Sequence, residues 1–411
     1  MTELALSPLA PARFPALADV SGIRLATASS GLKYTGRDDL LLIATDEGTS
    51  FAGVFTMSAT AAAPVLVSRE GVASGRARAI VTNAGNANAF TGQAGEAAIT
   101  AYRAVFAEHL NLSADQILIA STGVIGEPLD GQVIAAKARD MSDRLGAASW
   151  QDAALAIRTT DTFAKGASRT LILDGQTITL NGIAKGSGMI APDMATMLAY
   201  IATDACISPS CLQTMVTAAV RTSFNAITVD SDTSTSDSLY VMATNKAGHE
   251  TITDMNSTAG QVFFAALHEL MKELAQLIVR DGEGASKFIT VRVNGAADEA
   301  DARQIAFAIA NSPLVKTAVA GGDANWGRIV MAVGKSGAKA DRDRLEISVG
   351  GVIITKDGQR VTDYDEDPVA AHMAGDEIDI SVDIGLGDGQ AEIWTCDLTH
   401  GYIQINADYR S

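Results

Sequence analysis

The sequence is poor in the residues on which many reactive sites depend. Its 411 residues include only three cysteines and five histidines. Cys206, Cys211 and Cys396 show no CxxC spacing, which argues against a disulfide framework and against a cysteine zinc site. The histidines lack ligand spacing, and neither HExxH nor GxSxG occurs. The zinc hydrolases and the serine hydrolases that carry these motifs are therefore disfavoured.

Positive charge and long apolar runs are also scarce. The 31 basic residues are outnumbered by 48 acidic ones, which gives a net charge of −17. Nucleic acids and anionic membranes both attract basic surfaces, so neither is expected as a partner. No uncharged apolar run is long enough to cross a membrane. The N-terminus has no basic stretch followed by an apolar core, so we expect a soluble, cytoplasmic protein.

Motifs for phosphates, dinucleotides and metals are incomplete. The stretch 182–187 suggests a phosphate loop, but such a loop needs the order Gly-Lys-Ser and the sequence has Lys185-Gly186-Ser187. The acidic and hydroxyl-rich stretch 230–237 lacks the glycine and the distal glutamate of a calcium-binding loop. No dinucleotide fingerprint follows a predicted strand. We therefore expect neither a metal nor a bound cofactor.

What the sequence does contain indicates a well-packed α/β protein. Hydrophobic residues make up 47% of the chain and charged residues 19%, and the length favours two or three domains. A hairpin is expected around Asp174-Gly175, and residues 261–280 show the clearest helical spacing. After Lys287 the chain changes to short strands around one helix, so a domain boundary is placed near residue 285.

The remaining elements are predicted from short apolar runs and helical spacing. An asparagine-rich loop is expected at 83–88, where the side chains either line a polar pocket or satisfy loop backbone. Strands are expected at 40–44, 51–55, 79–81, 116–120, 289–293, 345–349, 352–354, 377–382 and 391–394, and helices at 96–110, 129–145, 150–158, 209–222 and 300–311.

The stretch 181–205 is the most distinctive part of the chain. Its glycines flank Lys185, and an apolar run from 194 to 202 follows Pro192. This run reads as a buried strand. Thr196, near its start, is either a β-branched residue that fills the strand or a buried nucleophile.

Two further features bear on that choice. Ser121-Thr122-Gly123 follows a predicted strand, and it is either an ordinary turn or a pair of donors for an oxyanion. The sequence shows no histidine that is placed to activate a threonine. A threonine can still act as a nucleophile if it becomes an N-terminus, because its own α-amino group then serves as the base. That chemistry requires a cut between Ala195 and Thr196, by attack of the Thr196 hydroxyl on the Ala195 carbonyl.

Many segments, in order along nearly the whole chain, resemble the ornithine acetyltransferase family (glutamate N-acetyltransferase, an enzyme of arginine biosynthesis). The most specific is residues 184–204, which resembles the self-processing segment of that family. The other matching segments are 33–40, 86–92, 121–126, 159–162, 280–285, 325–328 and 405–410.

The resemblance implies a layered α-β-β-α sandwich of the ornithine acetyltransferase/aminopeptidase type, with a smaller C-terminal α/β domain. It implies a proenzyme cut between Ala195 and Thr196, and α and β chains that assemble as a heterotetramer. The corresponding division is an α chain of residues 1–195, a first part of the β chain at 196–285 that begins with the nucleophile, and a C-terminal domain at 286–411.

The resemblance also implies the reaction and its residues. Thr196 is implied as the nucleophile that accepts acetyl from N2-acetyl-L-ornithine and passes it to L-glutamate in a ping-pong cycle. Thr122 and Gly123 are implied as the oxyanion hole. The implied substrate-binding positions are Thr159, Lys185, Thr196, Glu283, Asn406 and Ser411. Whether acetyl-CoA is also a donor is left open.

Some positions depart from the family pattern, and two other functions stay open. Gly322 and Ala324 stand in a loop where glutamate and proline are expected, and Ser231 and Ser236 stand where glycine and asparagine are expected. An N-terminal-nucleophile amidase or aminopeptidase on the same scaffold would release free acetate. A catalytically silent binding protein would remain a single uncleaved chain.

Overall fold

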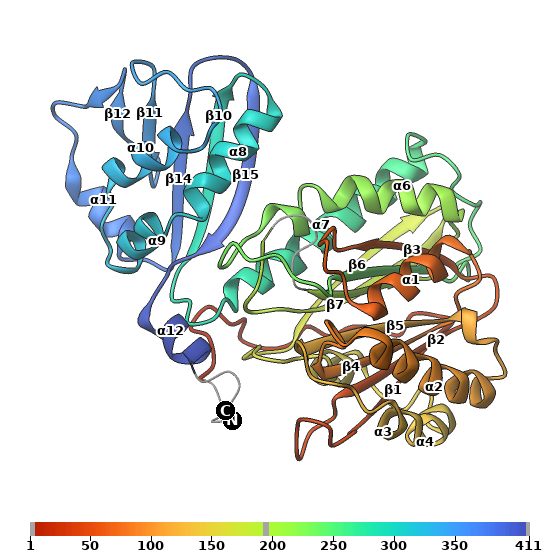
Figure 1. The fold of residues 1–411 in the computed structure, drawn as a ribbon. Coiled ribbons are helices and arrows are strands. Elements are labelled where there is room, and N and C mark those ends of the chain that lie inside the picture. The colour runs from red at the N-terminus through yellow and green to blue at the C-terminus, as the bar shows by residue number, and fades with distance from the viewer. Residues whose placement is uncertain (1–4, 192–196, 408–411) are drawn as a thin grey trace.

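The protein, seen here as a computed structural model that describes residues 5–191 and 197–407, has two lobes (Figure 1). The larger lobe contains two β-sheets and extends to the end of helix α7. The smaller lobe contains a third sheet. A last helix, α12 (His400–Ala407), leaves the smaller lobe and lies below it in the view of Figure 1. In the described ranges no helix is both long enough and apolar enough to cross a membrane.

The two sheets of the larger lobe have four and five strands. The first has the order β1-β2-β4-β5, with β4 and β5 parallel and the other pairs antiparallel. The second has the order β3-β9-β8-β7-β6, and only β8 and β9 are parallel. The strands are β1 (Ile23–Ala28), β2 (Leu40–Thr45), β3 (Ser50–Phe55), β4 (Ala79–Asn86), β5 (Ile117–Val124), β6 (Lys165–Leu173), β7 (Gln176–Lys185), β8 (Leu198–Thr203) and β9 (Ser238–Ala243).

The sheets stack face to face because their strands are apolar on both faces. In β2, Leu41 and Ile43 join the core between the two sheets, while Leu40 and Leu42 join the core under the outer helices. A strand covered on both faces reads as a continuous apolar run instead of an alternating one. This explains the run at 40–44.

Helices cover the outer faces and close the sides of this sandwich. On the first sheet lie α2 (Gly92–Leu110), α3 (Gly131–Ala135) and α4 (Ala138–Asp143). On the second lie α6 (Pro209–Val220) and α7 (Thr258–Arg280). Helices α1 (Ala63–Ala73) and α5 (Trp150–Ala156) pack at the two open sides, against strands of both sheets. The result is the expected α-β-β-α arrangement.

The smaller lobe is a six-stranded sheet with helices against it. Its strand order is β13-β12-β11-β14-β10-β15. The core formed by α7 and the second sheet continues into this lobe. Its elements are β10 (Phe288–Ala296), β11 (Glu346–Val349), β12 (Val352–Lys356), β13 (Gln359–Arg360), β14 (Glu377–Asp383), β15 (Gly389–Cys396), α8 (Glu299–Ala310), α9 (Pro313–Ala320), α10 (Trp326–Gly334) and α11 (Glu366–Met373).

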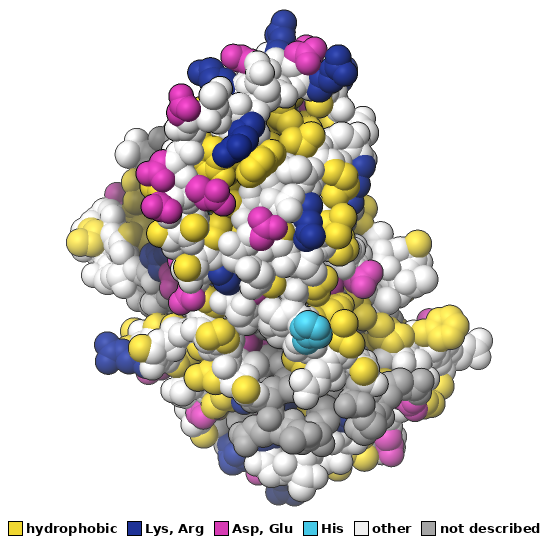
Figure 2. All heavy atoms as spheres, turned by 90° about the vertical axis from the view of Figure 1, so that its left-hand side faces the viewer, with side chains coloured by type: hydrophobic (Ala, Val, Ile, Leu, Met, Phe, Trp, Pro, Cys, Tyr) yellow, Lys and Arg dark blue, Asp and Glu magenta, His cyan; other side chains and the backbone are white. Residues whose placement is uncertain are grey.

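Figure 2 shows the molecule from the side of the smaller lobe. Acidic and basic side chains are interspersed there with hydrophobic ones. The described residues on this face therefore form no continuous stripe of one sign, as a nucleic-acid-binding face would.

Most predicted elements are confirmed, and four expectations are corrected. After Lys287 the strands are accompanied by four helices, α8 to α11, where one was expected. The three that were missed have only eight or nine residues, which is too short for helical spacing to be clear. The asparagines from 83 to 86 belong to β4, and Ser121-Thr122-Gly123 belongs to β5, so both strands run further than predicted. The polar ends of β4 and β5 stay in register with each other, which extends the ladder past the apolar part. The helix expected at 129–145 is two short helices, α3 and α4. The division at 195 and near 285 remains a prediction.

Candidate active site

A pocket of about 290 Å³ opens where strands and loops of the larger lobe meet α12. It brings together six of the residues predicted for the site, from five separate parts of the chain. These are Thr122, Gly123, Thr159, Lys185, Glu283 and Asn406. Thr196, Ala195 and Ser411 lie outside the described residues.

Gly123 occupies a position that only glycine can fill. It pairs with Gly85 across the parallel strands β4 and β5, and its φ is +129°. A Cβ atom there would lie 2.2 Å from the carbonyl carbon of Gly85. The absence of a side chain therefore lets β4 and β5 lie this close together. Gly123 also lines the pocket, where a backbone N–H could serve as a donor for an oxyanion.

Among the described residues that line the pocket, Lys185 at the end of β7 is the only cation. Its side chain is buried, and its Nζ donates to the Oγ1 of the adjacent Thr122 at 3.1 Å. Burial lowers the pKa of Lys185, Asp161 opposes that shift, and the charge of Lys165 adds to it. A buried ammonium with no bound carboxylate among the described residues can take a carboxylate from a ligand.

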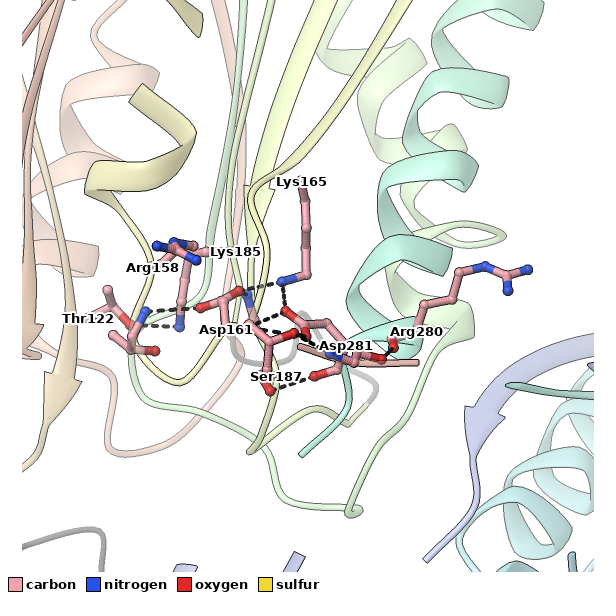
Figure 3. Close-up of polar contacts among 12 residues, drawn as sticks. Thr122, Arg158, Asp161, Lys165, Lys185, Ser187, Arg280 and Asp281 are labelled. Carbon is pink, nitrogen blue, oxygen red and sulfur yellow. Dashed lines mark hydrogen bonds and ion pairs between the residues drawn. The ribbon is translucent and has the colours of Figure 1, made fainter. Parts of the chain in front are cut away.

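Behind Lys185 lies a buried ion-pair network (Figure 3). Lys165 Nζ lies 2.6 Å from Asp161 and 2.5 Å from Asp281, and all three side chains are fully buried. Asp161 also accepts the N–H groups of Gly186 at 2.7 Å and Thr159 at 2.9 Å. The network therefore fixes the backbone on both sides of the pocket, next to Lys185 and at Thr159.

The two carboxyl groups of the network differ in their pKa. Burial would raise the pKa of Asp161, but the charges of Lys165 and Lys185 and the Gly186 N–H hold it well below its usual range. Burial raises the pKa of Asp281. Asp161 is thus the firmly ionised member, and its charge is what keeps two lysines close together in a buried place.

Glu283 lies on the pocket wall just after α7. Its Oε2 accepts a hydrogen bond from Asn406 Nδ2 of α12 at 2.7 Å. The backbone N–H of Glu283 donates to the carbonyl of Ser187. Gly188 faces it so closely that a Cβ there would lie 2.4 Å from Oε2. Burial raises the pKa of Glu283, with Asp230 adding to the rise. The C-terminal helix thus supplies one wall of the pocket.

The segment around the predicted cut is held at both described ends by aspartates. Asp230 accepts the N–H groups of Met189 and Ile190, the latter at 2.9 Å. Asp237 is fully buried, and its Oδ1 accepts the N–H of Met197 at 2.9 Å. Burial raises the pKa of Asp237 well above its usual range.

Two of the positions that depart from the family pattern lie in this neighbourhood. Ser231 has a φ of +66°, in the left-handed region where glycine is favoured. It stands where glycine was expected, so the departure changes the residue but not the backbone shape. Ser236 lines the pocket, with Ser234 and Thr235.

The sequence did not reveal Asp161, Lys165, Asp281 or Asp237 as parts of the site. Lys165 contacts Asp161, 4 residues away, and Asp281, 116 residues away, and no local pattern can indicate the second contact. Across 5–191 and 197–407 no group of three or more His, Cys, Asp and Glu side chains could hold a metal ion. The three cysteines are free and buried.

Comparison with known proteins gives consistent results. Residues 24–411 match the ArgJ family. The chain is 52% identical over 408 residues to the arginine biosynthesis bifunctional protein ArgJ of Ruegeria pomeroyi, covering 99% of this chain and 98% of that protein. It is 53% identical over 412 residues to the protein of the same name from Agrobacterium fabrum, covering 100% of each.

Solved structures include an ArgJ protein of Bacillus halodurans, at 41% identity. Its TM-score is 0.49, and the match covers 51% of this chain and 97% of that one. An ornithine acetyltransferase of Mycobacterium tuberculosis in complex with ornithine is 31% identical. Its TM-score is 0.37, and the match covers 46% of this chain and 95% of that one.

Proposed function

The chain belongs to the ArgJ family and is an acetyltransferase of arginine biosynthesis, and on that premise we propose that it moves acetyl from N2-acetyl-L-ornithine to L-glutamate through an ester on Thr196. The observation that carries this proposal is the pocket. It gathers the strand end at Gly123, a buried lysine and a buried glutamate. These groups match an acetyl carbonyl, a carboxylate and an ammonium, the three polar parts of acetylornithine.

The first half of the cycle loads the enzyme. The Thr196 hydroxyl attacks the acetyl carbonyl, and the α-amino group of Thr196 takes the hydroxyl proton. The carbonyl oxygen of the acetyl group becomes an oxyanion. The Gly123 N–H and the Thr122 hydroxyl stabilise that charge, and a donor of this kind is typically worth about 3 kcal/mol of barrier. The C–N bond then breaks, the α-amine of ornithine leaves with the proton, and an acetyl ester remains.

The second half reverses these steps with the amine of glutamate as the attacking group. Lys185 holds the α-carboxylate in both halves, as a buried point charge. Glu283 and Asn406 lie at the other end, toward the side chain of the amino acid. Thr159 and Ser411 complete the binding positions. No bound cofactor is needed, because the threonine itself carries the acetyl group.

Processing and assembly follow the same proposal. The chain cuts itself between Ala195 and Thr196, and the resulting α and β chains form a heterotetramer in the cytoplasm. We propose that acetyl-CoA also loads Thr196, because the second half of the cycle does not depend on the source of the ester. The donor would then need to bring only its thioester carbonyl to Gly123.

The test is the Thr196→Ala variant assayed with acetylornithine and with acetyl-CoA. We expect it to remain a single chain on a denaturing gel and to lose transfer from both donors. Thr177→Ala, at an exposed position of β7, is the matched control and should be cut and active. A Thr196→Ala protein that is still cut after residue 195 would overturn the scheme. Release of free acetate without transfer to glutamate would indicate a hydrolase instead.

A further inference from the structure

The proposed function sets a problem of charge for the pocket, and the inference below rests on that function. Ornithine and glutamate share an α-amino acid end but differ at the other. Ornithine ends in a δ-ammonium and glutamate in a γ-carboxylate. A ping-pong cycle brings both amino acids to the same acetylated threonine, so one pocket must accept opposite charges at the same end.

The charged groups that line the pocket are few. Among its described lining residues Lys185 is the only cation and Glu283 the only carboxyl group. With the α-carboxylate on Lys185, the side chain of either substrate points to the Glu283 end. An ionised Glu283 suits the ammonium of ornithine, but it would repel the carboxylate of glutamate.

We propose that Glu283 accepts both substrates by changing its protonation state. It binds the δ-ammonium of ornithine as a carboxylate. It binds the γ-carboxylate of glutamate as a neutral acid, whose O–H donates to the substrate oxygen.

The surroundings of Glu283 suit such a change. No cation in the described chain forms an ion pair with it, and Asn406 occupies only Oε2. The charged and titratable groups that face it are Lys185 at the end of β7, Asp230 and Tyr402, whose hydroxyl donates to Asp230 Oδ2 at 3.3 Å. Burial raises the pKa of Glu283, Asn406 and Thr160 lower it through hydrogen bonds, Asp230 raises it and Lys185 lowers it. Because the pKa of Glu283 is raised, the carboxyl group can be protonated more easily. The γ-carboxylate of a bound glutamate would raise this pKa further.

The protons taken up and released by Glu283 balance over one cycle. Binding of glutamate takes one proton from solvent onto Glu283, and release of N-acetylglutamate returns it. Ornithine and acetylornithine bind with no such uptake. No oxidant or further reactant is involved.

The test compares two donors that differ only at the end in question. N-acetylornithine and N-acetylglutamate both have an acetylated α-nitrogen, and neither titrates between about pH 6 and 9. We would measure kcat/KM for acetylation of the enzyme by each donor under single-turnover conditions, from the mass gain of the chain that carries Thr196. All effects of pH on the nucleophile cancel in the ratio of the two values.

The ratio of the two kcat/KM values should depend on pH in a defined way. Acetylglutamate reacts with the protonated form and acetylornithine with the ionised form. The ratio of acetylglutamate to acetylornithine therefore falls about tenfold for each unit of rising pH, because it follows the ratio of the two forms. A ratio that does not change with pH in the wild-type enzyme would overturn the proposal.

The Glu283→Gln variant sharpens the result, because its amide can donate to a carboxylate but carries no charge. We expect acetylation by acetylornithine to fall roughly 10- to 100-fold, as on loss of a hydrogen bond to a charged group. Acetylation by acetylglutamate should stay within about threefold of its wild-type value at low pH, and the ratio should no longer depend on pH. Glu273→Gln, which removes a surface charge that pairs with Arg169, is the matched control and should keep the wild-type slope.

Two further outcomes separate this inference from its premise. Absence of acetylation by either donor would contradict the proposed function itself. Equal losses for both donors in Glu283→Gln would leave that function standing and overturn the inference. A second variant, Arg158→Gln, tests another group that could bind the γ-carboxylate, because Arg158 precedes Thr159 and its Nε has no partner among the described residues. A loss of acetylation by acetylglutamate alone in this variant would also overturn the inference. That loss would assign the γ-carboxylate to the arginine.

Discussion

Replacing Lys165 with methionine tests whether the buried ion pairs hold the site together. The side chains of Lys165, Asp161 and Asp281 are all 0% exposed, and the lysine bonds both carboxylates. Methionine fills nearly the same volume without the charge. Two carboxylates would then face each other in a dry place with no cation between them.

The magnitude follows from this burial. Removing one partner of a buried ion pair typically costs about 3–5 kcal/mol, because the remaining charge is left uncompensated. We therefore expect Lys165→Met to lower the free energy of unfolding by about 3–5 kcal/mol at pH 8. The same substitution at Lys246 should cost less than about 1 kcal/mol, because Lys246 and its ion-pair partner Asp46 are 38% and 42% exposed to solvent.

The dependence on pH has a definite sign. In the wild-type protein the pKa of Asp161 is depressed, so its stabilising effect is present above the unfolded pKa and is lost as pH falls through the folded pKa. Without Lys165 the burial of Asp161 and Asp281 raises their pKa, and ionisation destabilises the fold as pH rises. The cost of the substitution should therefore shrink on acidification, by up to about 1.4 kcal/mol per unit for each carboxyl that takes up a proton.

The assay is urea unfolding at pH 8 and pH 5, followed by tryptophan fluorescence. Both lysine variants would be made in the Thr196→Ala background so that every sample is one chain. A Lys165→Met protein as stable as Lys246→Met at pH 8 would refute the reasoning. An equal loss at the two pH values would refute the assignment to uncompensated carboxylates.

Two further predictions concern the walls of the pocket. Gly123→Ala should lower the thermal midpoint and displace this strand end, with loss of transfer from every donor, since its Cβ would meet the Gly85 backbone at 2.2 Å and its φ is +129°; a fully active, equally stable variant would show that the site does not depend on the close approach of β4 and β5 at this position. Asp237→Asn keeps an acceptor for the Met197 N–H but loses a carboxyl whose pKa burial raises. We expect it to fold, with a thermal midpoint close to that of the wild type, and to cut itself at least about tenfold more slowly, as followed by the two half-chains on a gel; normal cleavage would exclude a role for the Asp237 proton.

Local patterns predicted most elements of the sandwich, although β1, β9 and α1 were not predicted. The hairpin around Asp174-Gly175 and helix α7 follow from turn chemistry and helical spacing, and both are confirmed. The strand ends were misjudged because asparagine, serine and threonine are typical of loops. In β4 and β5 they stay in strand conformation, since parallel pairing with a neighbour satisfies their backbone.

The sequence indicated some residues of the candidate site and missed others, and the reason is related. Lys185 and Gly123 stand out beside glycines and next to an apolar run, so their neighbourhood marks them. Asp161 and Asp281 do not, because their importance comes from one buried lysine that bonds both across the fold. Their own sequence neighbours look like ordinary polar loops. Charge networks of this kind depend on tertiary contacts, which a single sequence does not display.

The order of strands in the second sheet has a consequence for the fate of the cut chain. Strands β3, β7 and β6 precede residue 195 and strands β8 and β9 follow it, yet the sheet runs β3-β9-β8-β7-β6. Residues 180–185 of β7 pair with 198–203 of β8 along the whole of the latter strand. The two products of a cut at 195 would be interleaved within one sheet. They could not be exchanged or separated like subunits, because dissociation would require the sheet itself to unfold.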